Sequence, residues 1–156
     1  MQALDGSCGV IQVLGVPITP MTVLKGTKLF SEASRVLVEA MWIAQVRRLI
    51  AVTGLETGDS RGTAGFLHAR VLFPLILQRI YDDKSAQEEI IQSSGLDWTI
   101  VRPGILTDGP ATGRYRVLKD TQSWQGGFIS RRDVANFLIG QITDEANIGR
   151  TPVIIK

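Results

Sequence analysis

Hydrophobic positions along the chain follow two alternating patterns, short unbroken runs and longer stretches with steps of three and four residues. Short apolar runs that end at glycine, proline or polar residues are typical of buried strands. They predict strands at residues 8–14, 49–52, 98–102, 115–118, 127–129 and 152–155. The three- and four-residue steps predict helices at residues 29–44, 66–94 and 130–142. Because strands alternate with long helices, we expect an α/β fold whose parallel sheet is covered on both faces.

Local signals mark some of the helix ends. Gly95 is placed to end the long helix in a left-handed cap, and Pro74 either starts a new helix or kinks one. Ser130 is the expected N-cap of the last helix, and Asp133, three residues later, gives a variant of the capping box.

Composition narrows the class of protein. The 156 residues predict a single domain, 1–156, with 44% hydrophobic residues and 17 Lys and Arg against 15 Asp and Glu. This charge balance argues against a nucleic-acid or membrane surface. Apolar runs are too short to span a bilayer and the start lacks a signal-peptide pattern, so we expect a cytoplasmic protein. With one cysteine, Cys8, and one histidine, His68, we expect no disulfide and no metal, Cys8 being a small core residue and His68 a surface or packing residue.

Three glycine-containing stretches follow successive predicted strands. In open α/β sheets, ligands lie beyond the carboxyl ends of the strands, where glycine lets a ligand approach the backbone. Any one stretch could simply end its strand, but three together predict a shared crevice. The stretches are Leu14, Gly15 and Val16, then Thr53 and Gly54, then Pro103, Gly104 and Ile105.

Two segments carry a family resemblance. Residues 47–54 (RRLIAVTG) and 82–108 (DDKSAQEEIIQSSGLDWTIVRPGILTD) resemble the atypical short-chain dehydrogenase/reductases, as do residues 112–115 (TGRY) and 129–135 (ISRRDVA). The most similar branch is the NAD(P)H-binding, NmrA-like group that includes biliverdin-IXβ/flavin reductase. The resemblance implies a Rossmann-like, doubly wound parallel sheet. It also implies a small-molecule substrate and NADP as cofactor, with NAD as the alternative.

The chain departs from this family at its start. The Gly-x-x-Gly-x-x-Gly turn that binds the pyrophosphate does not occur before Gly15. We therefore expect an N-terminally truncated domain that lacks the first strand–helix units. We also expect the chain made alone to bind NADPH weakly, and to self-associate through the exposed edge of its sheet.

The catalytic pattern of the family is also altered. Typical members use serine, tyrosine and lysine, with the lysine holding the nicotinamide ribose and lowering the pKa of the tyrosine. Here Thr53 stands at the serine position, and Tyr81 and Lys84 are three residues apart rather than four. The resemblance makes all three catalytic candidates and adds Lys84 to the cofactor contacts. The structural alternatives are a packing role for Tyr81, a solvated Lys84 and a Thr53 that only completes its strand.

Other charged residues are weaker candidates. Asp82 and Asp83 are explained by a nearby helix start, whose dipole favours acidic side chains, without a catalytic carboxylate pair. Arg114, Arg116 and Lys119 could meet an acidic substrate or could form a solvated strand face.

Three functions remain in competition. The first is an NAD(P)H-dependent oxidoreductase that passes hydride to a small conjugated acceptor such as a flavin or quinone. The second is an NmrA-like regulator that senses the dinucleotide without turnover, which the altered Tyr–Lys spacing favours. The third is an inactive truncated remnant.

Overall fold

The computed structural model describes residues 2–17, 19, 22, 25–54, 69–119 and 126–156. His68 lies outside these residues. The helices are α2 (Leu29–Ile43), α3 (Ala69–Gln92) and α4 (Arg131–Gly140), with short 3-10 turns η1 (Gln2–Leu4) and η4 (Glu145–Asn147). The strands are β1 (Val10–Gln12), β2 (Arg48–Val52), β3 (Asp97–Pro103), β4 (Ile105–Thr107), β5 (Arg116–Leu118), β6 (Phe128–Ser130) and β7 (Val153–Ile155).

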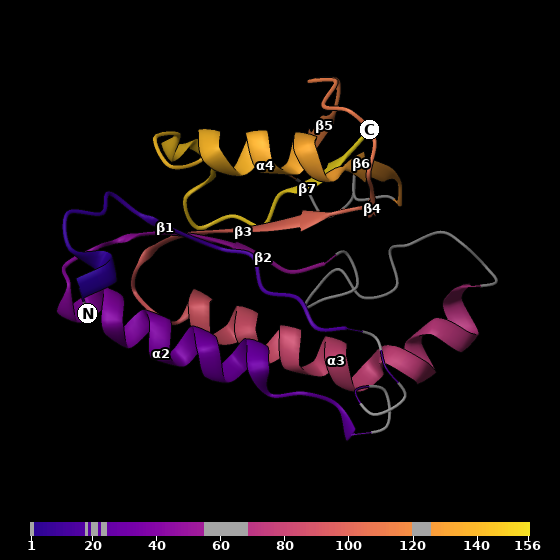
Figure 1. Ribbon diagram of the computed structural model, residues 1–156, viewed down its shortest axis with the longest axis horizontal. Coiled ribbons are helices and arrows are strands. Elements are labelled where there is room, and N and C mark those ends of the chain that lie inside the picture. The colour runs from indigo at the N-terminus through magenta and orange to yellow at the C-terminus, as the bar shows by residue number, and fades with distance from the viewer. Residues whose placement is uncertain (1, 18, 20–21, 23–24, 55–68, 120–125) are drawn as a thin grey trace.

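The main sheet has the strand order β1-β2-β3-β7-β5 and is mostly parallel. The expected parallel sheet is therefore confirmed for β1, β2, β3 and β7, and strand β5 is added antiparallel to β7. A second, two-stranded parallel sheet joins β4 to β6, and β4 was not predicted from the sequence. Figure 1 shows α4 on one face of the main sheet and α2 and α3 on the other, so the α/β, Rossmann-like layering is confirmed.

The core lies in two layers, one on each face of the sheet. Alternate residues of β2 and β3 point to opposite faces, so each strand supplies both layers. Toward α2 and α3, the buried cluster is Met41, Val46, Leu49, Ala51, Ile91, Leu96 and Ile100. Toward α4, it is Ile50, Val101, Ile129, Val134, Phe137, Leu138 and Ile154.

One local prediction needs correction, one choice between alternatives is narrowed and one prediction is confirmed. Cys8 is exposed and precedes β1, so it is not a core residue; the strand begins only at Val10. Helix α3 runs through Pro74 as one element, which excludes the alternative that a new helix starts there. Gly95 has φ of +70°, the left-handed conformation expected after a helix.

The N-terminus of α4 is capped as predicted, and the Asp133 carboxylate, which accepts from the Ser130 hydroxyl at 2.9 Å, has further partners outside the helix. Ser130 Oγ accepts a hydrogen bond from the Asp133 backbone N–H at 3.0 Å. The Asp133 carboxylate accepts from the backbone N–H groups of Thr112 and Gly113, each at 2.8 Å. These bonds, that from Gly113 first, hold the pKa of Asp133 below its usual value. Asp133 therefore ties the turn before β5 to α4.

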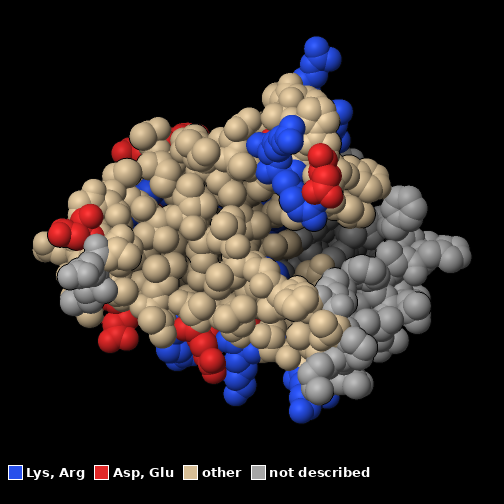
Figure 2. Space-filling view, in the orientation of Figure 1, with Lys and Arg blue, Asp and Glu red and all other residues tan. Residues whose placement is uncertain are grey.

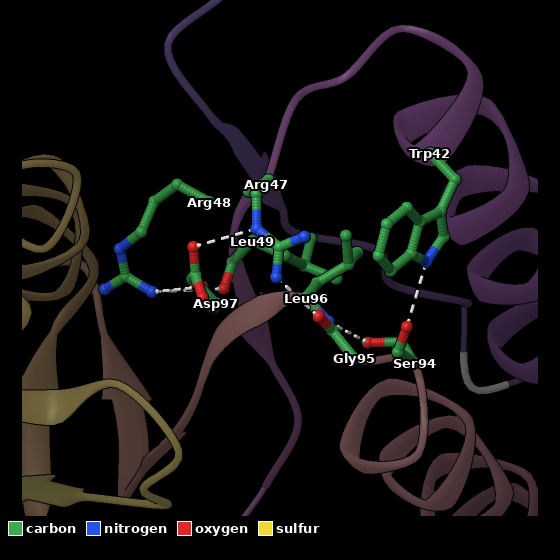
Figure 3. A network of polar contacts seen from close by, with 8 residues as sticks. All are labelled: Trp42, Arg47, Arg48, Leu49, Ser94, Gly95, Leu96 and Asp97. Atoms are coloured by element: carbon green, nitrogen blue, oxygen red, sulfur yellow. Dashed lines mark hydrogen bonds and ion pairs between the residues drawn. The ribbon is translucent and has the colours of Figure 1, made fainter.

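Polar contacts fasten the amino-terminal ends of β2 and β3 to the helices (Figure 3). The Trp42 indole N–H donates to the Ser94 carbonyl at 2.9 Å, joining the ends of α2 and α3. The Arg47 guanidinium lies 5.1 Å from the centroid of the Trp42 ring and donates to the Gly95 carbonyl. It also pairs with Asp97 at 3.4 Å. These contacts tie the ends of α2 and α3 to the start of β3.

Candidate functional site

The predicted stretches that follow β1 and β2 both contact helix α3. Because β1, β2 and β3 are adjacent and parallel, their carboxyl ends lie along one edge of the sheet. The loop after β1 continues to the helices, since Leu14 and Val16 pack with Phe30, Ile80 and Tyr81 in one apolar cluster.

Thr53, the residue after β2, is hydrogen-bonded to a buried ion pair. Its hydroxyl donates to Glu88 Oε1 on α3 at 2.5 Å, and its backbone N–H donates to the Val101 carbonyl. The Glu88 carboxylate also accepts two bonds from Arg102 on β3, from Nε at 3.1 Å and Nη2 at 2.6 Å. Glu88 is 2% exposed and Arg102 is fully buried. Three elements thus meet at one carboxylate.

Lys84 lies one helical turn before Glu88 on α3. Its Nζ is 4.0 Å from the centroid of the Phe30 ring on α2. Burial lowers the pKa of Lys84 from 10.5 to about 8, although the negative charges of Glu88 and Asp83 act to raise it. The side chain is half-buried. Near neutral pH, Lys84 is therefore a cation that can release its proton more easily than an ordinary lysine.

Tyr81 is brought to the same place as Lys84 and Thr53. A Cβ on Gly54, the residue after Thr53, would lie 3.6 Å from the Tyr81 ring, in ordinary contact. All three catalytic candidates from the sequence therefore lie where β2 ends against α3. Tyr81 also packs in the apolar cluster described above, so its proposed packing role is present in the structure.

Asp83 has a structural task that the sequence did not indicate correctly. It lies inside α3, not at a helix start, and it caps α2 instead. Its carboxylate accepts from the backbone N–H groups of Phe30 at 2.9 Å and Ser31 at 3.2 Å, and from the Ser31 hydroxyl. The expectation that a helix dipole explains this carboxylate holds, but for a different helix.

Gly104 is closely packed by its own chain. A Cβ there would lie 2.4 Å from the Gly127 carbonyl oxygen and 2.9 Å from Ile155 Cγ2. The packing of the protein itself therefore excludes a side chain at Gly104, and the predicted approach of a ligand there stays a prediction. Pro103 is buried in β3, whereas Ile105 is 64% exposed. Near Gly15, by contrast, no heavy atom of the residues that the structure describes would lie within 4 Å of a Cβ.

The basic residues proposed for an acidic substrate are all exposed. Arg114, Arg116 and Lys119 lie in and around β5. Figure 2 shows basic side chains at the upper right of the visible face and along its lower edge, while uncharged residues cover most of the centre. In the described part of the chain, no three His, Cys, Asp or Glu side chains are grouped as metal ligands. Within that same part, no helix combines the length and the hydropathy needed to cross a membrane.

Comparison with known proteins identifies the family. A sequence profile described as NAD(P)H-binding matches residues 2–145, which is most of the chain. The chain belongs to this NAD(P)H-binding family. This match confirms the resemblance to an NAD(P)H-binding branch of the atypical short-chain dehydrogenase/reductases that the sequence motifs indicated.

Solved structures of other proteins share the fold. ChuY, an anaerobilin reductase from Escherichia coli O157:H7, superimposes with a TM-score of 0.77 at 25% identity, over 99% of this chain and 66% of its own. A short-chain dehydrogenase/reductase from Veillonella parvula, solved in complex with NADP, gives 0.76 at 18% identity, over 99% and 65%. The latter likeness shows the fold alone.

A curated relative is similar in sequence. The Bacillus subtilis (strain 168) protein YhfK, described as an uncharacterized sugar epimerase, is 36% identical over 110 residues. That match covers 70% of this chain and 45% of YhfK. The chain thus spans less than half of YhfK and about two thirds of the structural relatives.

Sequence reasoning missed the polar residues that support the site. Glu88 was not singled out, nor was the buried amide network in which Gln87 Nε2 donates to Gln12 Oε1 at 2.9 Å and Gln12 Nε2 donates to Ser34 Oγ at 3.0 Å. A signal was present, because Gln87 and Glu88 lie on α3 between Ile80 and Ile91, at spacings that a core-facing helix usually fills with apolar side chains.

Proposed function

We propose that the protein is an NADPH-dependent oxidoreductase that reduces a small conjugated acceptor such as a flavin or a quinone. The observation that carries this proposal is the meeting of Thr53, Tyr81 and Lys84 where β2 ends, beside a loop that leaves Gly15 open. The match to the NAD(P)H-binding family supports a nicotinamide nucleotide as the cofactor.

The donor groups in this region fit a nicotinamide nucleotide. A half-buried ammonium suits ribose hydroxyls or a phosphate, a threonine hydroxyl suits a polar ring substituent, and open backbone suits a flat ring. The residues that would hold the cofactor are Leu14, Gly15, Val16, Thr53, Gly54, Lys84, Pro103, Gly104 and Ile105. When bound, the reduced nicotinamide supplies the hydride.

Lys84 has the chemistry to manage the proton that must accompany the hydride. With a pKa of about 8, Lys84 is mostly protonated at pH 7, so it can donate a hydrogen bond or a proton. The Phe30 ring and the apolar cluster around it exclude water from one side of the ammonium. Tyr81, one turn earlier on the helix, is the second group able to pass a proton.

The test is NADPH oxidation followed by absorbance, with FMN and menadione as acceptors. We expect turnover by the wild-type chain and a loss of about a hundredfold in Lys84→Met, because general acid catalysis contributes about that factor. Lys156→Met, at the exposed C-terminal residue, is the matched control and should keep full activity. Equal activity in Lys84→Met and wild type would contradict the assignment.

A dinucleotide sensor is the second candidate, because Tyr81 and Lys84 keep the three-residue spacing that departs from the catalytic pattern. The same experiment separates the two functions. Stoichiometric NADPH binding without oxidation by either acceptor would favour the sensor.

A further inference from the structure

The ion pair behind Thr53 fixes the direction of a hydrogen bond. Glu88 accepts two bonds from Arg102 and one from Thr53, all in the buried interior. A carboxylate held by a guanidinium in this two-pronged way stays ionised and can only accept hydrogen bonds. The single hydroxyl proton of Thr53 must therefore point toward Glu88. Any further hydrogen bond at Thr53 Oγ has to be donated by the other group.

Stability alone does not account for this arrangement. A buried ion pair rarely stabilises a fold more than well-packed apolar residues would, because both charges lose their hydration. What the pair does provide is orientation. Arg102 comes from β3 and Glu88 from α3, so the Thr53 hydroxyl is set by two elements besides its own. Its remaining lone pairs are fixed relative to the sheet edge.

We propose that Glu88 and Arg102 are positioning residues that make Thr53 a hydrogen-bond acceptor for an N–H or O–H group of the bound nucleotide. Thr53 then recognises the ligand and does not donate a proton to the acceptor being reduced. This inference rests on the proposed function for the identity of the ligand. The orientation of the hydroxyl itself does not depend on it.

The experiment measures NADPH affinity by chemical-shift titration in four variants of the full chain. We expect Thr53→Val to raise the Kd about three- to tenfold, the loss typical of one uncharged hydrogen bond, and Thr53→Ser to stay within about twofold. The paired change Glu88→Gln with Arg102→Gln removes both charges, so that no buried charge is left alone. It should raise the Kd by a similar factor.

The fourth variant combines the paired change with Thr53→Val and tests the coupling. If Glu88 and Arg102 act through Thr53, the paired change raises the Kd less than twofold once the hydroxyl is gone. An equal increase with and without the hydroxyl would show a merely structural role and overturn the proposal. So would a fall in kcat in Thr53→Val with unchanged NADPH affinity, because Thr53 would then act in the chemical step.

A second measurement needs no ligand. A hydroxyl proton bound to a buried carboxylate exchanges slowly, so we expect a Thr53 Oγ–H resonance in the wild-type spectrum that the paired change removes. If the wild type bound no NADPH, the proposed function and the ligand role of Thr53 would both fail. The resonance would still decide whether Glu88 holds the proton, and its absence in the wild type would overturn the positioning role.

Discussion

Replacing Gly104 by alanine would place a methyl group inside the joint between the main sheet and the β4–β6 sheet. The added Cβ would lie 2.4 Å from the Gly127 carbonyl oxygen, about 0.6 Å closer than real Cβ contacts come. That oxygen is not free to move, because it accepts the Ile105 backbone N–H at 2.8 Å. On the other side, Ile155 Cγ2 would lie at 2.9 Å. The backbone of β6 would have to shift.

The cost follows from two contributions. Overpacking a buried site costs about 1–3 kcal/mol. Weakening the hydrogen bond from Ile105 to Gly127 adds about 0.5–1.5 kcal/mol. We therefore expect Gly104→Ala to lower the free energy of unfolding by roughly 2–4 kcal/mol, a large part of the stability of a domain this size.

Urea denaturation without any cofactor measures this loss. Gly127→Ala should cost less, because its nearest contact would be Ile155 Cβ at 3.0 Å. Gly140→Ala is the matched control: nothing lies within 4 Å of a Cβ there, and alanine favours the helix, so stability should be unchanged or up to about 1 kcal/mol higher. If Gly104→Ala unfolded within 0.5 kcal/mol of the wild type, the packing argument would be refuted.

Three further outcomes are expected. In NMR spectra of reductively methylated protein, one lysine should titrate near pH 8, and its signal should be missing in Lys84→Arg. Because folding lowers the pKa of Lys84, the free energy of unfolding should fall as the pH drops from about 10.5 to 8. A free energy of unfolding that stays constant over this pH range would contradict the prediction. Asp83→Ala should lower the free energy of unfolding by about 1–2 kcal/mol, because it removes the cap of α2 at Phe30 and Ser31. Asp83→Asn keeps an acceptor oxygen and should lower it less. Equal losses of stability in the two variants would argue against capping. The chain should self-associate through β1, the edge strand of the main sheet. In sedimentation experiments, Val13→Lys should reduce this self-association, because Val13 lies just after β1 and is 63% exposed. An unchanged distribution of oligomers in this variant would place the contact elsewhere.

The main strands were predictable because each contains a short run of apolar residues in the sequence. Residues 49–52 and 153–155 are unbroken apolar runs, and the structure buries both in the centre of the sheet. Helix α2 was predicted to within one residue by its periodicity. Strand β4 was missed because its three residues are all exposed and carry no pattern of burial. The direction of β5 was missed because it is set by pairing with β7, which no local signal records.

Residues of the candidate site were predictable only where the order and direction of the strands fix their position. Thr53 and Gly54 follow a parallel strand, so their place at the ligand edge follows from the fold. Glu88, and the role of Asp83 in capping α2, were missed because their partners, Thr53 and the start of α2, are far away in sequence. Whether the predicted residues contact a cofactor stays a prediction for the binding experiments above.

The contacts at the amino-terminal end of the sheet hold the helices to the strands, whereas the described residues of the loops at the opposite end take no part in them. Arg47 reaches the turn between α3 and β3, and the neighbouring Arg48 points to the opposite face, where its guanidinium donates to the Gln141 carbonyl after α4. Arg47, which directly precedes β2, and Arg48, the first residue of β2, thereby anchor both helical layers. The loops at the far edge can diverge without loosening that anchorage. Loops there can change in sequence and length while the sheet and its helical layers stay in place.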